Sequence, residues 1–327
     1  MKIFMYEVRE DEKKDIADIA GKLGVEVEIS KETPCLENAG LAAGACGISF
    51  LGQGKIDAAL LDKYKEMGVT CLSTRTIGYN HIDIAHAKEI GMKVCNARYA
   101  PNGVADFTVM LILMCIRQYK QAFWRGYVND FGLNGLMGRE MKDLTVGVCG
   151  TGRIGAAVIN NLSGFGCKII AYDVYQNPSL MDRVTYVSKE ELFRTADVIT
   201  LHMPLLPDTM HMIDHDAIEI MKEGVVIVNC ARGELCDVDA LVDGIESEKI
   251  GALGMDTVEG EEGIIHEDHR TDILKNRDWF YLHQFRNVVI THHMAFYTDA
   301  AVKSMVECGL TGIYQMYTEG KCSTQLA

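Results

Sequence analysis

Short runs of apolar and β-branched residues alternate along the chain with longer segments whose apolar positions recur at helical spacing. Helical patterns cover, for example, Glu10–Leu23 and Lys55–Met67. Between such segments, the first hundred residues contain five runs that predict strands: Lys2–Val8, Val25–Ile29, Gly47–Leu51, Val69–Ser73 and Met92–Asn96. This alternation predicts a parallel sheet with crossover helices, and five strands are enough for one compact doubly wound unit.

The pattern changes at Pro101. Proline suits the first turn of a helix, and a long apolar helix is predicted from there over Asn102–Phe123. The stretch Trp124–Lys142 contains four glycines and little periodicity, which favours an arm or a linker.

A second series of strands follows this linker. The last segment of the chain, Thr298–Tyr317, is predicted to be a helix that folds back on the first unit. Six runs predict the strands of the second unit: Leu144–Cys149, Lys168–Tyr172, Asp197–Leu201, Val225–Asn229, Ile250–Met255 and Val288–Thr291. Six strands with intervening helices match the full dinucleotide-binding fold.

Composition and charge narrow the possible functions. The 327 residues are 48% apolar and 24% charged, which is typical of a soluble globular protein of two domains. A net charge of −14 argues against binding to nucleic acid, because such binding depends on many Lys and Arg side chains. The eleven cysteines are scattered and form no C-x-x-C pair, so we expect reduced thiols in a cytoplasmic protein.

Neither a membrane span nor a signal peptide is expected. The longest uninterrupted apolar run, Val109–Ile116, has eight residues, whereas a membrane-spanning helix needs about 20. The apolar run at the N-terminus is too short for a signal peptide and has no small-residue cleavage site.

The strongest local motif is a G-x-G-x-x-G turn that follows a predicted strand and opens a predicted helix: Gly150, Thr151, Gly152, Arg153, Ile154 and Gly155. In this context the first glycine allows a tight turn, and the second lets the backbone approach a pyrophosphate. The third glycine lets helix and strand pack closely, and the helix N-terminus faces the negative charge. Asp173 lies eighteen residues after Gly155, at the end of the next strand. A carboxylate there accepts hydrogen bonds from the ribose hydroxyls and favours NAD over NADP.

Polar residues recur after the later strands, at the edge of the sheet where ligands of open α/β folds bind. Arg232 follows the fourth strand of the second unit, and His292 and His293 follow the sixth. Arginine offers a permanent charge to a substrate carboxylate, and histidine can deliver a proton near neutral pH. A nearby carboxylate would favour the protonated imidazole. These groups suit the reduction of a carbonyl beside a carboxylate, but periodicity does not choose between the two histidines.

Other chemistries have less support in the sequence. His266 and His269 flank two acidic residues, and His211 and His215 lie close together, but neither pair has thiolates or a third histidine at ligand spacing. We therefore expect no metal. A nucleophilic serine is not expected either, because the chain has no G-x-S-x-G motif.

Several motifs in order make the chain resemble the NAD-dependent D-2-hydroxyacid dehydrogenases, and in particular their D-lactate dehydrogenase branch. The resemblance runs from Lys2 to Tyr314. Its marks are the 150–155 turn, Asn229-Cys230-Ala231-Arg232-Gly233, the stretch 255–261 and His293-Met294-Ala295-Phe296-Tyr297-Thr298. Gly78–Asp83 and Val104–Asp106 look most like the vancomycin-resistance type of D-lactate dehydrogenase.

The resemblance implies a fold and a set of site residues. The fold is α/β with two doubly wound parallel sheets: a Rossmann NAD-binding domain, 101–298, inserted in a flavodoxin-like substrate domain, 1–100 plus 299–327. The family's catalytic Arg, Glu and His fall on Arg232, Glu261 and His293, which selects His293 over its neighbour. Further cofactor contacts fall on Met203, Pro204, Thr209, Cys230, Ala231 and Asp256, and substrate contacts on Leu51, Ile77, Gly78, Tyr99 and Phe296. The proteins of this family are usually homodimers.

Two positions depart from the family's pattern. His292 stands where the family usually has Pro, and Leu51 stands where members that prefer pyruvate usually have Tyr. An aliphatic residue at position 51 resembles members that act on larger 2-oxo acids, whether branched, aromatic or dicarboxylic.

The implied reaction is the reversible reduction of a 2-oxo acid by NADH to its (R)-2-hydroxy acid. A D-lactate dehydrogenase and a dehydrogenase for a larger 2-oxo acid both remain open as interpretations. A co-repressor that senses NADH has the same fold and the same three residues, and is a remote alternative.

Overall fold

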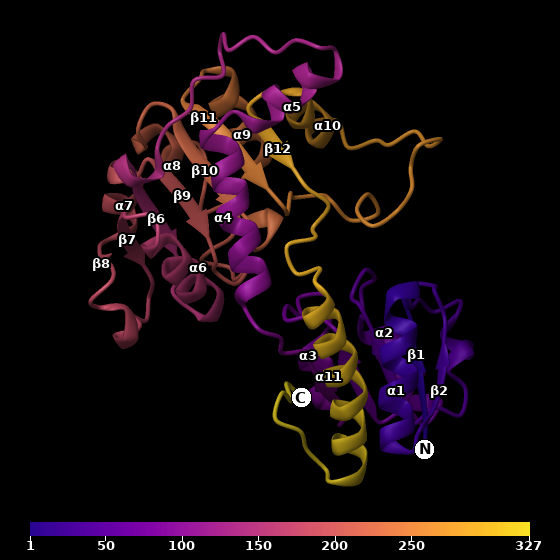
Figure 1. Cartoon of the computed structure of the whole chain (residues 1–327). Helices are drawn as coiled ribbons and strands as arrows, with labels where there is room; N and C mark the ends of the chain where they lie inside the picture. The colour runs from indigo at the N-terminus through magenta and orange to yellow at the C-terminus, as the bar shows by residue number, and fades with distance from the viewer. The chain divides into compact units, whose positions relative to one another are not determined.

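The computed structural model describes residues 1–327, which form two compact units. The first unit consists of Met1–Ala100 together with Tyr297–Ala327, and the second consists of Pro101–Phe296. Figure 1 shows each unit as a sheet covered by helices.

The sheet of the first unit has five parallel strands in the order β2-β1-β3-β4-β5. All five predicted strands are present, with ends that differ from the prediction by three residues at most: β1 Lys2–Met5, β2 Glu26–Ile29, β3 Gly47–Phe50, β4 Cys71–Thr74 and β5 Lys93–Cys95. Alternation along β1 divides its side chains between the two faces, because successive residues of a strand point to opposite sides. Ile3 and Met5 belong to one hydrophobic cluster and Phe4 to another.

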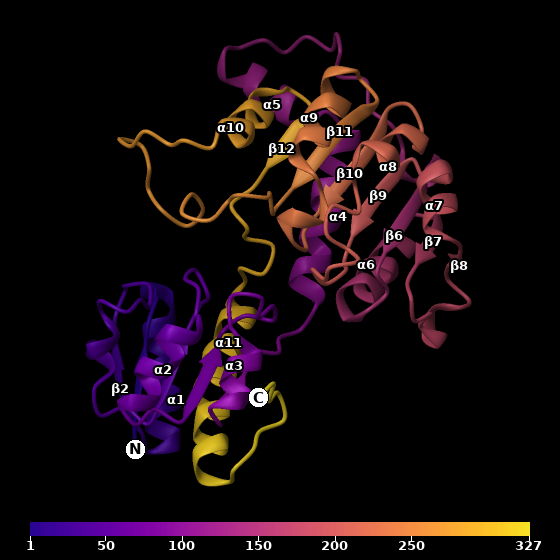
Figure 2. The ribbon, with the colours of Figure 1, turned by 180° about the vertical axis from the view of Figure 1, so that it is seen from behind.

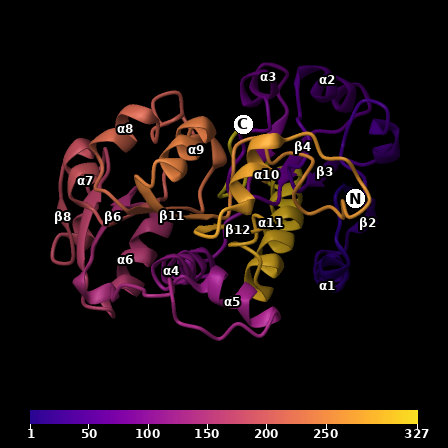
Figure 3. The ribbon, with the colours of Figure 1, turned by 90° about the horizontal axis from the view of Figure 1, so that it is seen from above.

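Helices cover both faces of this sheet (Figure 3). One face carries α1, Lys13–Leu23, and α11, Asp299–Thr318. The other carries α2, Ala58–Glu66, and α3, Ile84–Glu89. The predicted C-terminal helix is thus confirmed, and it packs on the sheet built by the N-terminal hundred residues.

The sheet of the second unit has seven parallel strands in the order β12-β11-β10-β9-β6-β7-β8. The six predicted strands are present, and the two-residue β8 was not predicted. Their bounds are β6 Thr145–Cys149, β7 Lys168–Tyr172, β8 Thr185–Tyr186, β9 Val198–Leu201, β10 Val225–Asn229, β11 Ile250–Met255 and β12 Val288–Ile290. The strand order reverses at β6, which is where ligands bind in open α/β sheets.

Helices also cover both faces of the larger sheet (Figure 3). α4, Asn102–Ile116, and α6, Arg153–Ser163, lie on one face. α4 approaches β11 closely at Gly254, where an added Cβ would lie 3.1 Å from the Cys115 sulfur. The other face carries α7 Lys189–Thr195, α8 His215–Ile220, α9 Val238–Glu246 and α10 Arg277–Gln284.

The prediction of one helix over Asn102–Phe123 is wrong. α4 ends at Ile116, and a second helix, α5, covers Tyr119–Tyr127. Gln118 between them has φ +53°, a left-handed conformation that cannot continue a right-handed helix. α5 therefore includes the first four residues of the expected arm, 124–127. Residues 128–140 are irregular.

Five short 3-10 helices complete the secondary structure, at Glu10–Glu12, Ala39–Ala42, Met141–Asp143, Pro178–Leu180 and Gly233–Leu235. All eleven cysteines are free thiols. None of the helices combines the length and the apolar character that crossing a membrane would require.

Candidate active site

The G-x-G-x-x-G motif forms the turn between β6 and α6, as predicted. Gly150 has φ +93°, and a Cβ at this position would lie 2.6 Å from the carbonyl oxygen of His202. A Cβ at Gly155 would lie 1.9 Å from the carbonyl oxygen of Gly150. Both positions therefore need glycine, because the obstructing atoms belong to the backbone and cannot move aside.

Gly152 is the N-cap of α6, and no side chain caps the helix there. An added Cβ at Gly152 would meet no atom within 4 Å. The space beside Gly152 is thus open, at the positive end of the α6 helix dipole. This arrangement fits the pyrophosphate of a dinucleotide.

Asp173 follows β7 and binds the glycine-rich turn. One carboxylate oxygen accepts from the backbone N–H of Thr151 at 2.5 Å and from its hydroxyl at 3.0 Å, and the other accepts from Tyr175 N–H at 3.0 Å. The Tyr186 hydroxyl lies 3.0 Å from the Thr151 hydroxyl. Sequence reasoning missed this second contact, because Tyr186 lies on the unexpected strand β8.

The loop after β9 is held by its own polar groups. The Thr209 hydroxyl donates to the carbonyl oxygen of Pro204 at 2.7 Å and accepts from Leu206 N–H at 2.8 Å. Thr209 is buried, so its hydroxyl fixes the course of the loop that carries Met203 and Pro204.

His202 is the first residue of this loop and is partly buried, with its Nδ1 shielded from solvent. Burial lowers the pKa of its imidazole to about 3. Its Nε2 lies 3.0 Å from the Thr200 hydroxyl. A neutral imidazole does not serve as an acid at neutral pH, so His202 is not suited to be the proton donor.

Arg232 lies in the turn after β10. The turn is fixed by Asn229, whose side-chain amide donates to the Arg232 carbonyl oxygen at 2.7 Å and whose oxygen accepts from Ala231 N–H at 3.0 Å. The guanidinium donates to the Ala231 carbonyl oxygen at 2.6 Å and forms no salt bridge. A half-buried guanidinium without a carboxylate partner is suited to bind an anion.

Gly233 brings the Arg232 turn against the loop after β11. A Cβ at Gly233 would lie 2.2 Å from the Val258 carbonyl carbon and 2.3 Å from the Glu259 nitrogen. The loop after β11 carries Glu261, so the backbone segments that bear the arginine and the glutamate touch each other.

Glu261 and His293 form the closest charged pair of the site. One Glu261 oxygen lies 2.6 Å from His293 Nδ1, and the other accepts from Val258 N–H at 2.9 Å. The carboxylate is thus held by its own loop and directed at the imidazole. This contact orients the imidazole ring. The geometry singles out His293, because no such contact is present at His292.

Asp256 holds the loop that carries His293. Its two oxygens accept from the Thr291 hydroxyl at 2.5 Å, from Met294 N–H at 2.9 Å and from Ala295 N–H at 2.8 Å. His293 itself has φ +50°, so these bonds hold a backbone conformation that is uncommon for a residue other than glycine. The resemblance implied a cofactor contact for Asp256, and the structure adds this positioning role.

The amino-acid sequence of the chain is similar to those of known dehydrogenases. The NAD-binding-domain model of the D-isomer specific 2-hydroxyacid dehydrogenases matches residues 109–295. An aromatic 2-oxoacid reductase of Clostridium sporogenes is 42% identical to the chain over 327 residues, which covers 99% of each. The chain belongs to the family of the D-isomer specific 2-hydroxyacid dehydrogenases.

Two further comparisons extend the likeness. The dehydrogenase is 39% identical over 308 residues to a D-lactate dehydrogenase of Lactobacillus delbrueckii subsp. bulgaricus, covering 93% of this chain and 92% of the relative. The solved structure of a D-2-hydroxyisocaproate dehydrogenase matches with a TM-score of 0.89 and 32% identity, over 100% of this chain and 99% of that one. The predicted family, fold class, reaction class and cofactor NAD are thereby confirmed.

Four of the expected substrate residues of the dehydrogenase lie in the first unit. Leu51, Ile77 and Gly78, and Tyr99 lie in loops that follow β3, β4 and β5. The Ile77 carbonyl oxygen accepts from the Asn96 side chain at 2.7 Å, and the Gly78 carbonyl oxygen accepts from the Thr76 hydroxyl at 2.7 Å. These bonds fix the direction of the backbone in the 77–78 loop.

Phe296, the fifth expected substrate residue, lies in the second unit beside the catalytic candidates. Its ring centroid is 6.3 Å from that of His293 and 6.2 Å from that of His266. His266 also places Nε2 3.2 Å from the His293 carbonyl oxygen. From the sequence, His266 was a candidate only for a metal site. In the structure, His266 and Phe296 form an aromatic group around His293. The loop of His266 connects β11 to α10 (Figure 2).

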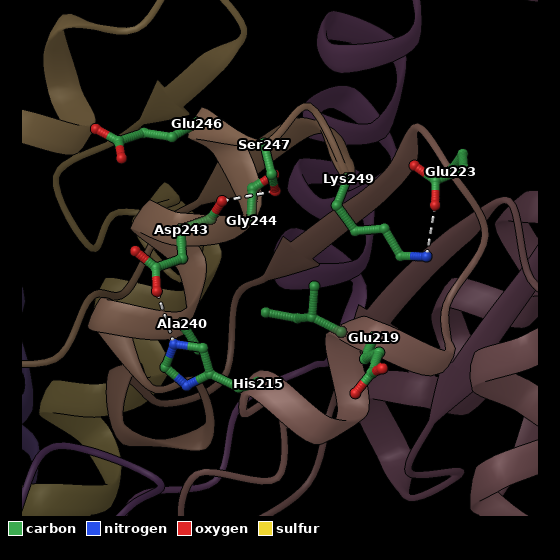
Figure 4. Close-up of a pocket in the computed structure, with 10 residues that line it drawn as sticks. His215, Glu219, Glu223, Ala240, Asp243, Gly244, Glu246, Ser247 and Lys249 are labelled. Carbon is green, nitrogen blue, oxygen red and sulfur yellow. Dashed lines mark hydrogen bonds and ion pairs between the residues drawn. The ribbon is translucent and has the colours of Figure 1, made fainter.

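A separate surface hollow lies between α8 and α9 (Figure 4). Two ion pairs lie in it: His215 with Asp243 at 3.0 Å and Lys249 with Glu223 at 2.8 Å. Lys249 directly precedes β11, and Glu223 lies two residues before β10. The hollow therefore borders the sheet edge opposite to Arg232 and His293.

Proposed function

We propose that the dehydrogenase uses NADH to reduce 2-oxo acids with side chains larger than methyl, giving the (R)-2-hydroxy acids. The observation that carries the chemistry is the 2.6 Å contact between Glu261 and His293 at the same sheet edge as the unpaired Arg232. These groups can bind a carboxylate and deliver a proton to an adjacent carbonyl.

The proposed mechanism assigns one task to each side chain. Arg232 binds the substrate carboxylate and polarises the carbonyl group. His293 Nδ1 is taken by Glu261, so Nε2 is the nitrogen that gives its proton to the carbonyl oxygen. Bound NADH supplies the hydride that adds to the carbonyl carbon. In the reverse direction His293 Nε2 accepts the hydroxyl proton.

For the cofactor, we propose that the 150–155 turn holds the pyrophosphate and Asp173 the adenosine ribose, with Met203, Pro204, Thr209, Cys230, Ala231 and Asp256 as further contacts. The second unit, Pro101–Phe296, would be the NAD-binding domain expected at 101–298. The first unit, Met1–Ala100 with Tyr297–Ala327, would be the substrate domain expected at 1–100 plus 299–327, with Ile77 and Gly78 N–H groups at the carboxylate. Tyr99 and Phe296 would complete the substrate contacts.

Leu51 and Phe296 favour a 2-oxo acid substrate with a large side chain. Leu51 replaces the tyrosine expected for members that prefer pyruvate, and the aromatic group around His293 offers ring edges to a large substituent. Relatives named for aromatic 2-oxo acids and for D-2-hydroxyisocaproate support the proposal. Pyruvate is the second candidate, favoured by the Gly78–Asp83 stretch and by relatives named D-lactate dehydrogenase.

The test is NADH oxidation by the purified protein with pyruvate, 2-oxoisocaproate, phenylpyruvate, 2-oxoglutarate and oxaloacetate. We expect kcat/KM for 2-oxoisocaproate or phenylpyruvate to exceed that for pyruvate at least about tenfold, because a pocket gains roughly 1–3 kcal/mol per methylene. A preference for pyruvate would establish the second candidate instead.

We further propose a homodimer that forms through the exposed face of α5. Tyr119, Phe123 and Tyr127 are half-exposed or more, and neighbouring rings contact each other along this helix with centroids 5.9 and 5.1 Å apart. Phe131, Leu133 and Met137 in the following segment are about 80% exposed or more. A second copy of the chain would cover such an apolar surface.

The free cysteines support a reducing, cytoplasmic location.

A further inference from the structure

Glu7 occupies a nest of backbone donors at the turn that follows β3. One of its carboxylate oxygens accepts from Leu51 N–H at 2.5 Å and from Gly52 N–H at 2.7 Å, and the other accepts from Gln53 N–H at 3.1 Å. Three successive N–H groups directed at one carboxylate form an anion-binding site. The chain supplies the anion itself, from a residue more than forty positions away.

The geometry of the nest suits a carboxylate. All three contacts are donors to the carboxylate, and charge-assisted bonds of this kind are short. Burial raises the pKa of Glu7 above its ordinary value, and it outweighs nearby Arg75 and the three backbone N–H groups, which lower it. The positive charge of Arg75 is already matched, since its guanidinium is fully buried and pairs with Glu12 at 3.0 Å.

The turn cannot redirect its N–H groups toward another anion. Gly52 has φ +86°, and an added Cβ there would lie 2.6 Å from the His81 ring. Thus Glu7 holds the turn from one side and His81 packs against it from the other. Glu7 is 3% exposed and has φ +56°, so its own backbone is committed to an uncommon conformation.

The consequence for specificity rests on the proposed function, in which Leu51 contacts the substrate side chain. The Glu7 carboxylate is one hydrogen bond away from the Leu51 backbone. A substrate with a second carboxylate at the end of its side chain would place a like charge near Glu7, and the local N–H groups would already be occupied. Like charges near each other at a buried site repel, and a tenfold loss of binding corresponds to about 1.4 kcal/mol.

We infer that Glu7 is a specificity-determining residue that excludes dicarboxylic 2-oxo acids by filling, with its own carboxylate, the anion site at residues 51–53. The dehydrogenase therefore takes 2-oxo acids with uncharged side chains. Glu7 acts through the turn and through its charge, and has no part in proton or hydride transfer.

The experiment compares 2-oxoglutarate with 2-oxoisocaproate, whose side chains are similar in length but differ in charge. Glu7→Gln removes the charge and keeps one acceptor oxygen, while Glu7→Ala empties the nest. We expect the ratio of kcat/KM for 2-oxoglutarate over 2-oxoisocaproate to rise about tenfold or more in both variants. Glu10→Gln is the matched control, since it removes an exposed carboxylate three residues away and should leave the ratio unchanged.

An unchanged ratio would overturn the inference, and an equal fall of kcat/KM for both substrates, which a purely structural role would give, is one form of that result. NADH titration by fluorescence and thermal unfolding of each variant verify that the protein is folded, and Glu7→Gln covers the case in which Glu7→Ala fails to fold. Wild-type protein that reduces no 2-oxo acid would instead contradict the proposed function itself.

Discussion

Glu261 divides its two oxygens between the backbone of its own loop and the imidazole of His293. Asp256 binds three donors in the segment 291–295. His293, the proposed proton donor, is therefore positioned by two carboxylates with different tasks. Glu261 orients the ring, and Asp256 fixes the backbone that carries it.

Asp173 provides a first prediction at this scale. Asp173→Ala should narrow the preference for NADH over NADPH about tenfold or more, because the variant lacks the carboxylate that accepts from the ribose and repels a 2′-phosphate. The ratio of kcat/KM for the two cofactors measures this. Asp182→Ala, an exposed carboxylate of the same unit, is the control. An unchanged ratio in Asp173→Ala would mean that Asp173 only ties Thr151.

The lowered pKa of His202 predicts that the free energy of unfolding depends on pH. Its folded pKa of about 3 lies below the ordinary 6.5, so the unfolded chain binds a proton in this window and the folded chain does not. Stability is therefore present above pH 6.5 and falls toward pH 3, by up to about 1.4 kcal/mol per pH unit. Urea unfolding of His202→Asn should show a shallower acid slope than wild type. The exposed control His215→Asn should keep the wild-type slope, and an equal slope in all three proteins would refute the claim.

At the scale of elements, the glycine-rich turn ties β6, α6 and the loop after β9 together. Gly155→Ala should weaken NADH binding at least about tenfold and lower the melting temperature, because the new Cβ would lie 1.9 Å from a backbone oxygen. Fluorescence titration and thermal unfolding measure both effects. Gly164→Ala at the other end of α6 is the control, since its Cβ would meet only one oxygen at 3.5 Å. Wild-type affinity in Gly155→Ala would show that the turn tolerates the methyl group.

Most elements could be predicted from the sequence, because a doubly wound fold repeats the same strand and helix patterns. The break between α4 and α5 could not be predicted, since no glycine or proline marks it and it depends on the left-handed backbone of Gln118. β8 has two residues, too few for any periodicity.

The candidate site shows the same division. The G-x-G-x-x-G turn is local and could be read directly. The choice between His292 and His293, and the contact of Glu7 with residues 51–53, depend on residues far apart in the chain that meet only in the fold.

For the whole molecule, the exposed aromatic face of α5 predicts association. Phe123→Glu should convert the proposed dimer to monomer at micromolar concentration, because a charge on each copy would be buried without a partner. Light scattering after size-exclusion chromatography measures the mass. Leu41→Glu introduces the same charge at a half-exposed leucine of the first unit and should leave the dimer intact. A monomeric wild type, or a dimeric Phe123→Glu, would contradict the proposed interface.

The central claim is that Arg232, Glu261 and His293 reduce a 2-oxo acid to its D-hydroxy acid. The most direct measurement is NADH-dependent turnover of 2-oxoisocaproate by wild type and His293→Ala, with chiral chromatography of the product. We predict the (R) enantiomer from wild type and at least a hundredfold lower rate in the variant, with NADH binding retained. Near-wild-type turnover by His293→Ala, or the (S) enantiomer as product, would contradict the account.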